Sequence, residues 1–204
     1  SRLAFADRNR YIADPDFHDV PVNRLIDPGY LGSRGKLIKA DKSMGKAEPG
    51  QVPGGAARLG TPIEVDKGFS TTHLSIVDDD GNAVALTSSI ENAFGSRLMV
   101  RGFLLNNQLT DFAFVPLAGN RAVANRAAPG KRPRSSMGPT LVVDGAGKLV
   151  LSLGSPGGSS IIGYVAKTII AALDWDMDIQ AAVDLPHFVN RNGATEVEKG
   201  TPIM

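Results

Sequence analysis

The chain has 204 residues, a formal net charge of +1 at pH 7, 42% hydrophobic residues and 21% charged residues. This composition is ordinary for a globular protein and excludes a disordered chain, and the small net charge gives no global field that points to nucleic acid or a membrane surface. The absence of cysteine excludes disulfides, thiolate nucleophiles and cysteine-ligated metals, and no apolar run approaches the ~20 residues of a membrane span. We expect no metal and no other cofactor, because metal-ligand spacing is missing among the three histidines, His18, His73 and His187.

The first 40 residues are expected to be partly helical. Apolar side chains in residues 2–13 fall roughly on one face, with charged residues between them. The prolines of "DPDFHDVP" end this helix, because the residue before a proline is pushed out of the α region. The following stretch, "VNRLIDPGYLGSRGKLIKA", is expected to hold one or two short helical turns.

Residues 41–70 are rich in glycine, proline and charge. A structureless segment of about 30 residues is unusual inside a compact domain. One interpretation is a mobile linker, and the other is a processing loop that must be flexible to be cut.

Strand-like patterns begin after this segment. "THLSIVD" alternates, with His73 and Ser75 on one face and Leu74 and Ile76 on the other, and "NAVALTSS" reads as the return strand of a hairpin. "GFLLNNQLTDF" is a third apolar stretch, and "GPTLVVDGAGKLVLSLGS" predicts a second hairpin that turns at residues 144–147.

Two helices are predicted after the second hairpin. Apolar residues recur at helical spacing from Ile161 to Ala172, and "DIQAAVDLP" predicts another helix that ends before Pro186. Strands followed by helices that pack on a sheet indicate an α+β fold with a layered core.

Thr71 is a candidate nucleophile at the edge of the first hairpin. An isolated threonine is a poor nucleophile, but as the first residue of a chain it has its own α-amine as a base, with a reference pKa of about 7.7–8.0. That chemistry requires cleavage between Ser70 and Thr71, and the preceding loop suits it.

The densest glycine-rich stretch, "GSPGGSS" (residues 154–160), precedes the long helix. Its successive backbone N–H groups suit an anion or an oxyanion, whereas a phosphate-binding P-loop would need a lysine that this stretch lacks. A plain strand-to-helix turn is the other interpretation.

Two further features have simpler interpretations. "KRPRSSMGP" (residues 131–139) is expected to be a solvated basic loop, with attraction of an anionic substrate as an alternative and nucleic acid as a weaker one, because no aromatic residues interleave. His73 is expected to be an ordinary histidine on a strand face.

Five motifs in order resemble one family: "TTHLSIVDDDGNAVALTSS", "FGS", "LLNNQLTDF", "RPRSSMGPTLVV" and "GSPGGSS". The resemblance is to the γ-glutamyltranspeptidases (γ-glutamyltransferases), which are N-terminal-nucleophile hydrolases, and it runs from about Ala4 to Gly200. It implies a four-layer αββα fold and a precursor that cuts itself ahead of Thr71. It also implies three segments: the end of a large subunit (1–40), a flexible processing linker (41–70) and a small-subunit-like catalytic domain truncated at its C-terminus (71–204).

The resemblance implies a role for each matched position. Thr71 forms the acyl-enzyme with γ-glutamyl donors such as glutathione, and water or an amino acid then accepts the acyl group. Ser89 supports the amine of Thr71. The other matched residues are Gln108 and Asp111 for the substrate α-amino group, Ser135 and Ser136 for its α-carboxylate, and Gly157 and Gly158 for the oxyanion hole.

Two residues depart from the family pattern. Glu91 stands where many members have an asparagine near the α-carboxylate, and an ionised glutamate there repels a carboxylate unless it is paired. Thr110 replaces the first acid of the usual Asp-Asp-Phe. The family also contains acylases that cleave glutaryl side chains from β-lactam precursors, and the retained Asp111 argues against that activity.

The sequence resembles an internal fragment of a longer polypeptide. We expect the remainder of the large subunit as a partner, little turnover by the isolated fragment, and self-association through exposed apolar faces. A non-catalytic binding module of the same fold is the alternative. Bacterial family members are commonly periplasmic or secreted, and we expect the same here.

Overall fold

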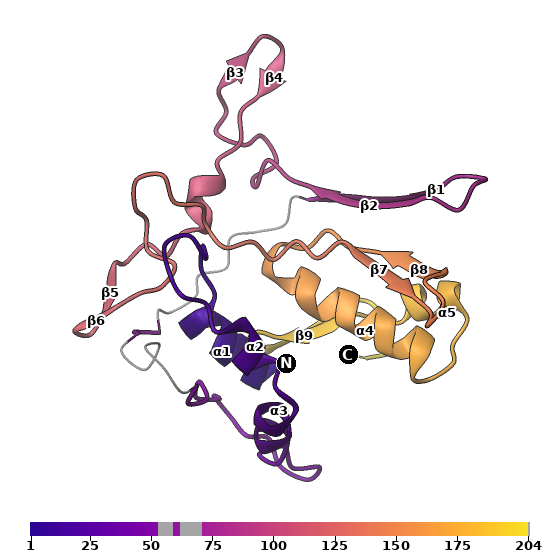
Figure 1. Ribbon diagram of the computed structural model, residues 1–204, viewed down its shortest axis with the longest axis horizontal. Helices are drawn as coiled ribbons and strands as arrows, with labels where there is room; N and C mark the ends of the chain where they lie inside the picture. Colours follow the sequence, from indigo (N-terminus) through magenta and orange to yellow (C-terminus); the bar gives the residue numbers. More distant parts are fainter. Residues whose placement is uncertain (53–58, 62–70, 204) are drawn as a thin grey trace. The chain divides into compact units, whose positions relative to one another are not determined.

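The computed structural model describes residues 1–52, 59–61 and 71–203. The chain divides into two compact units, which are described separately. The first unit is formed by the described residues within 1–65, 109–134 and 190–194, and the second by those within 66–108, 135–189 and 195–204. Figure 1 labels the elements of both.

Three helices open the first unit: α1 (Arg2–Tyr11), α2 (Val22–Leu25) and α3 (Pro28–Gly35). They confirm the helix expected over residues 2–13 and the short turns expected after it. Helix α3 begins where the Asp27 side chain accepts a hydrogen bond from the Tyr30 backbone N–H at 2.8 Å, with Pro28 in the first turn.

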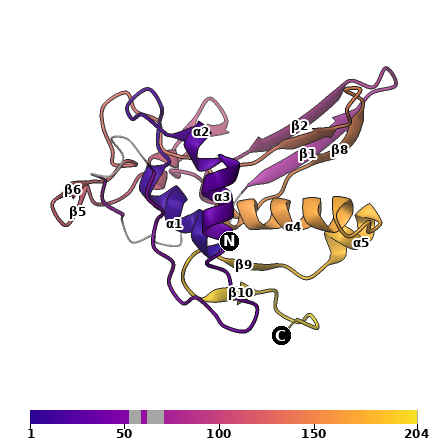
Figure 2. The ribbon, with the colours of Figure 1, turned by 60° about the horizontal axis from the view of Figure 1, so that its bottom comes forward.

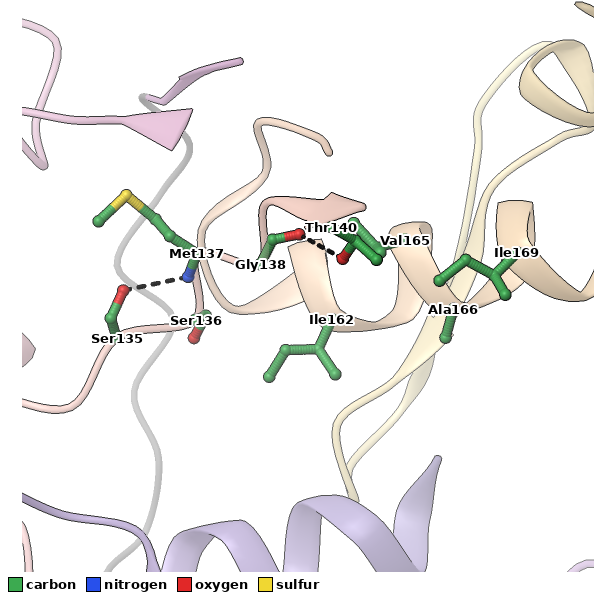
Figure 3. Close-up of a pocket in the computed structure, with 9 residues that line it drawn as sticks. All are labelled: Ser135, Ser136, Met137, Gly138, Thr140, Ile162, Val165, Ala166 and Ile169. Carbon is green, nitrogen blue, oxygen red and sulfur yellow. Dashed lines mark hydrogen bonds between the residues drawn. The ribbon is translucent and has the colours of Figure 1, made fainter. Parts of the chain in front are cut away.

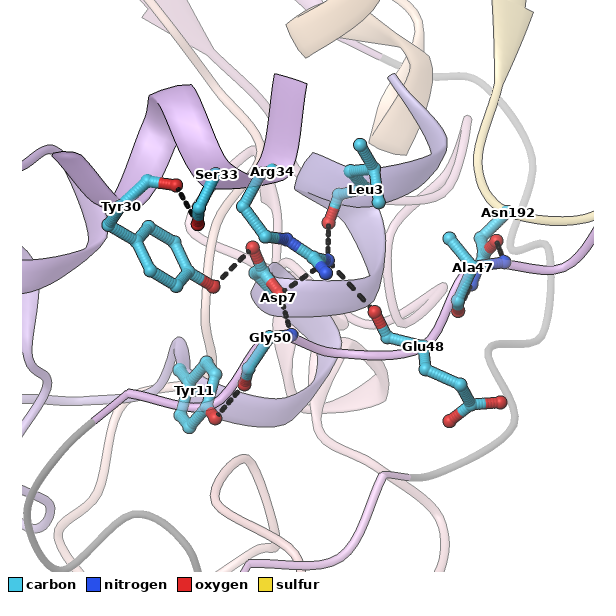
Figure 4. A network of polar contacts seen from close by, with 10 residues as sticks. All are labelled: Leu3, Asp7, Tyr11, Tyr30, Ser33, Arg34, Ala47, Glu48, Gly50 and Asn192. Carbon is cyan, nitrogen blue, oxygen red and sulfur yellow. Dashed lines mark hydrogen bonds and ion pairs between the residues drawn. The ribbon is translucent and has the colours of Figure 1, made fainter. Parts of the chain in front are cut away.

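A buried carboxylate ties the first unit together. Asp7 accepts hydrogen bonds from the Gly50 backbone N–H at 2.7 Å, the Tyr30 hydroxyl at 2.9 Å and the Arg34 guanidinium at 3.0 Å (Figure 4). Burial and the neighbouring Asp7 raise the pKa of Tyr30 above its usual range. The network joins α1, α3 and the segment around Gly50.

The first part of the expected flexible linker makes buried contacts at some positions. Val52 is 3% exposed and forms a core cluster with Tyr11, and the Asn192 side chain pairs with both backbone groups of Ala47 at 2.7 and 2.8 Å. These contacts anchor Ala47 and Val52 to the first unit, while the flexibility of the linker stays a prediction. The rest of the proposed linker lies mainly outside the described residues.

The basic stretch near residue 131 is only partly the solvated loop that its charges suggest. Lys131 is buried, and its ammonium donates to the carbonyls of Ala124 and Arg126. Arg132 forms ion pairs with Asp14 at 2.8 Å and with Asp16 at 2.6 Å. The hydrogen bond from the Arg132 side chain lowers the pKa of Asp14 to about 2. Lys131 and Arg132 are thus engaged by groups of the first unit, although the Arg132 side chain is still 67% exposed.

Two predicted hairpins form the strands of the second unit. Strand β1 (Thr72–Val77) pairs antiparallel with β2 (Ala83–Ser88), and β7 (Thr140–Val143) pairs with β8 (Leu149–Leu153). The two hairpins contact each other, and Figure 2 shows β8 beside β1 and β2. The face of the first hairpin that carries His73 and Ser75 contributes to this contact, because Ser152 of β8 donates a hydrogen bond to Ser75 at 3.0 Å.

Helix α4 (Ile161–Leu173) packs on the second hairpin, as its apolar spacing predicted. Leu153, Ile161 and Val165 form the buried cluster between them. Helix α5 (Ile179–Asp184) follows, with the Asp178 side chain as its N-terminal cap.

Several short strands were not predicted. They are β3 (Met99–Val100), β4 (Phe103–Leu104), β5 (Leu117–Ala118), β6 (Arg121–Ala122), β9 (Phe188–Asn190) and β10 (Thr195–Val197), which form three further pairs, β3 with β4, β5 with β6 and β9 with β10. The helices and hairpins agree with the α+β class, while the complete αββα sandwich stays a prediction. Among the described residues, no helix is long and apolar enough to cross a membrane.

Candidate active site

Thr71 stands directly before β1 and is half-buried. The strand register ends at the pair of Thr72 with Ser88, so Thr71 and Ser89 are the residues that directly adjoin this last pair. The role of Ser89 in supporting the amine of Thr71 stays a prediction. The Ser70–Thr71 bond itself reaches outside the described residues.

Glu91 follows Ser89 in a turn with unusual backbone geometry. Its φ is 71°, in the left-handed region that glutamate rarely adopts, and its backbone N–H donates to the Ser89 hydroxyl at 2.8 Å. The Asn107 side-chain amide donates to the Glu91 carboxylate at 2.8 Å, and the Asn92 backbone N–H donates to the Asn107 side chain at 2.9 Å. Glu91 is thus held by a neutral amide close to Ser89.

The glycine-rich loop adopts a backbone that requires glycine. Gly157 has φ 134° and Gly158 has φ 55°, and a Cβ on Gly157 would lie 2.8 Å from the Tyr164 ring. Among the described residues, no backbone hydrogen bond is donated by the N–H of either glycine. The loop then enters a short 3-10 turn (Gly158–Ser160) and α4. This geometry can present N–H groups to an oxyanion.

His73 packs this loop against the first hairpin. A Cβ on Gly154, where the loop begins, would overlap the His73 imidazole and lie 2.7 Å from its Cγ. His73 is the second residue after Thr71, so the strand that follows the candidate nucleophile touches the start of the oxyanion-type loop. No local pattern in the sequence predicted this contact.

Ser135 and Ser136 line a pocket of about 270 Å³ beside α4. Figure 3 shows the two serines at one end and Ile169 at the other, and the Ser135 hydroxyl accepts a hydrogen bond from the Met137 backbone N–H at 3.1 Å. The remaining lining residues are Met137, Gly138, Thr140, Ile162, Val165 and Ala166.

The candidate residues for the substrate amine fall on both sides of the division between units. Gln108 and Asp111 are the ends of one short 3-10 helix, but Gln108 belongs to the second unit and Asp111 to the first. The Asn125 side chain donates to the Asp111 backbone carbonyl at 2.7 Å. The other predicted site residues, Thr71, Ser89, Glu91, Ser135, Ser136, Gly157 and Gly158, all lie in the second unit.

A titratable cluster lies behind the glycine-rich loop. The Tyr164 ring, which faces Gly157, lies 4.0 Å from the His187 ring between centroids. Burial lowers the pKa of His187, the positive charge of Lys167 lowers it further, and Glu198 acts in the opposite direction. Within the described part of the chain, no group of three or more histidine and acidic side chains could hold a metal ion.

The structure thus brings the strand that follows Thr71 against the beginning of the glycine-rich loop. The family model "Gamma-glutamyltranspeptidase" matches residues 1–203. The glutathione hydrolase proenzyme of Bacillus subtilis (strain 168) is 38% identical over 98% of this chain and 34% of its own length. The chain belongs to the γ-glutamyltranspeptidase family, which confirms the resemblance.

Two solved structures are similar to the chain. The T380A mutant of Helicobacter pylori γ-glutamyltranspeptidase is 42% identical, with a TM-score of 0.53 over 58% of this chain and 67% of that chain. The cephalosporin acylase of Bacillus halodurans is 25% identical, with a TM-score of 0.79 over 99% of this chain and 33% of that chain. The chain thus spans about a third of the length of the hydrolase proenzyme and of the acylase.

Proposed function

We propose that the polypeptide containing this chain hydrolyses or transfers the γ-glutamyl group of glutathione and related amides, with Thr71 as the nucleophile. The observation that carries the proposal is that Thr71 and Ser89 adjoin the last pair of a hairpin, Thr72 with Ser88, and that His73 of this hairpin touches the beginning of the glycine-rich loop. The family membership and the proenzyme name of the B. subtilis relative support it.

The first step is self-cleavage. The Thr71 hydroxyl attacks the Ser70 carbonyl carbon, the peptide C–N bond breaks, and the nitrogen takes up a proton to become the free amine of Thr71. Water then hydrolyses the ester, which leaves a carboxyl group on Ser70 and a free hydroxyl on Thr71.

The second reaction uses the same hydroxyl on a γ-glutamyl amide. Thr71 Oγ gives its proton to its own α-amine and attacks the γ-carbonyl, and the N–H groups of Gly157 and Gly158 stabilise the oxyanion. The leaving amine takes the proton, and the ester on Thr71 is released by water or by an amino acid. Gln108 and Asp111 bind the substrate amine in this account, and Ser135 and Ser136 bind the carboxylate.

Glutaryl-side-chain acylase activity is the second candidate. The likeness to the cephalosporin acylase over 99% of the chain favours it. Glu91 does not separate the two candidates, because a glutaryl group carries a carboxylate at the same position as the α-carboxylate of a γ-glutamyl donor. Asp111 favours the first candidate, since a glutaryl group offers no α-amine for it to bind. Paired assays with γ-glutamyl and glutaryl anilides separate the two activities.

The remainder of the polypeptide is the proposed partner. The face of the first hairpin opposite His73 carries Leu74, Ile76, Val84 and Leu86, each at least 39% exposed. Covering this apolar face stabilises the hairpin, and without that cover we expect self-association.

The proposal is tested by comparing single variants at two neighbouring threonines. Thr71→Ala should abolish both cleavage ahead of residue 71 and release of anilide, while Thr72→Ala, at an exposed position one residue later, should retain both. Cleavage that persists in Thr71→Ala would overturn the proposal.

A further inference from the structure

The half-buried imidazole of His73 has hydrogen-bond partners on two strands. His73 Nδ1 shares a hydrogen bond of 2.8 Å with Thr87 Oγ1 on β2, and Nε2 shares one of 3.2 Å with Ser75 Oγ on β1. Ser75 in turn accepts a hydrogen bond from Ser152 on β8 at 3.0 Å. Both ring nitrogens therefore have partners, and the hydroxyl groups can adapt to either neutral tautomer.

The ring fixed in this way supports the beginning of the glycine-rich loop. A Cβ on Gly154 would overlap ring atoms Nδ1 and Cε1, so the backbone at Gly154 lies directly against the imidazole. This contact explains why residue 154 is a glycine although its backbone does not require one: no left-handed φ occurs there. Three residues later the same loop reaches Gly157.

We infer that His73 is a positioning residue that sets the distance between the glycine-rich loop and Thr71. This inference rests on the proposed function. The two connections are short, because Thr71 and His73 are two residues apart on one strand and Gly154 and Gly157 are three apart in one loop. Oxyanion donors act only when they lie within hydrogen-bond distance of the developing charge. A small shift of this loop should therefore lower the rate of acylation strongly and change the affinity for substrate much less.

A double-mutant cycle tests the contact. His73→Ala should lower kcat for a γ-glutamyl anilide about tenfold to a hundredfold and change KM much less. Gly154→Ala should lower kcat at least as much, because its methyl group collides with the imidazole. In the double variant the collision is absent, so the loss should be smaller than the product of the two single losses. Multiplicative losses would overturn the inference.

Two further variants separate positioning from general stability. His73→Asn keeps an amide that can bond to Thr87 and should recover part of kcat, whereas His73→Leu, of similar bulk, should not. Gly145→Ala is the matched glycine control, because nothing lies within 4 Å of its Cβ position, and it should keep the parent kcat. Equal kcat for His73→Asn and His73→Leu, at equal thermal stability, would show that His73 only fills space.

A readout without turnover distinguishes failure of this inference from failure of the proposed function. In protein labelled with ¹⁵N-glycine, His73→Asn should shift the amide resonances of Gly154, Gly157 and Gly158 and leave that of Gly145 in place. Shifted loop resonances in a protein that has no γ-glutamyl activity would contradict the proposed function but support the contact between His73 and the loop. Unshifted loop resonances would overturn the inference whatever the activity.

Discussion

The side-chain amide of Asn107 donates a hydrogen bond to the carboxylate of Glu91 at 2.8 Å, and the backbone N–H of Glu91 donates to Ser89. A neutral amide leaves the glutamate's negative charge in place, whereas a cation would cancel it. If Ser89 supports the nucleophile, this charge lies near the reacting substrate, and it bears on which acyl groups the site accepts.

Glu91→Asn should therefore improve the binding of donors that carry an α-carboxylate. Two like charges about 4 Å apart in a water-like medium repel by about 1 kcal/mol, which corresponds to about a fivefold lower KM once the charge is removed. Asparagine also tolerates the left-handed backbone at this position. Steady-state kinetics with γ-glutamyl and glutaryl anilides measure the effect. Glu91→Gln is the charge-only control, and an unchanged KM in both variants would contradict the explanation.

Gly157→Ala should impair the oxyanion-type loop. The added methyl group would lie 2.8 Å from the Tyr164 ring, and φ at this position is 134°. Because misplacing one oxyanion donor costs about as much as losing it, we expect kcat to fall by about a hundredfold. Single-turnover acylation of Thr71 measures this step. If Gly157→Ala acylates as fast as Gly145→Ala, the loop has no part in the chemistry.

Stability should fall in mild acid because of His187. Burial and Lys167 hold its pKa below the usual value, so the unfolded chain binds more protons than the folded one once the pH drops below about 6.5. The contribution of neutral His187 to the free energy of unfolding is fully present above that pH and is lost as the pH falls. The free energy of unfolding then changes by at most about 1.4 kcal/mol per pH unit for one proton. Urea unfolding between pH 7.5 and 5 measures the slope.

His187→Phe keeps a flat ring against Tyr164 and should make that slope shallower. A smaller slope should remain, because burial also lowers the pKa of His18. An identical slope in the parent and in His187→Phe would show that His187 does not titrate differently in the folded state.

Asp7→Asn should strongly destabilise the first unit. The substitution removes the charge that pairs with Arg34, and both side chains are only 12% exposed. Leaving one partner of a buried ion pair uncompensated typically costs about 3–5 kcal/mol. Chemical denaturation measures the loss. Asp27→Asn is the matched control, since asparagine caps a helix nearly as well as aspartate, and equal losses in the two variants would show that the buried network contributes little.

Local patterns predicted the elements that carry the candidate nucleophile and the glycine loop. Alternation and turn residues located both hairpins, and helical spacing located α4. Strands of two or three residues, such as β3 and β9, are too short to show a period, so they were not predicted.

The missed contacts depend on residues far apart along the chain. His73 shows the alternation of any strand residue, and only the folded chain brings Gly154 against its ring. Similarly, the buried state of Lys131 depends on carbonyl groups of a loop whose path no local pattern gives. The sequence therefore indicated which residues could do chemistry, but not the contacts that hold them.

The most direct test of the central claim is an intact-mass measurement on the purified protein, with Thr71→Ala measured in parallel. We expect two species in the parent that sum to the mass of the uncut chain plus one water, with the second beginning at Thr71, and a single uncut species in the variant. A parent that stays as one uncut chain, or a Thr71→Ala variant that is cut at the same bond, would contradict the claim that Thr71 is an N-terminal nucleophile.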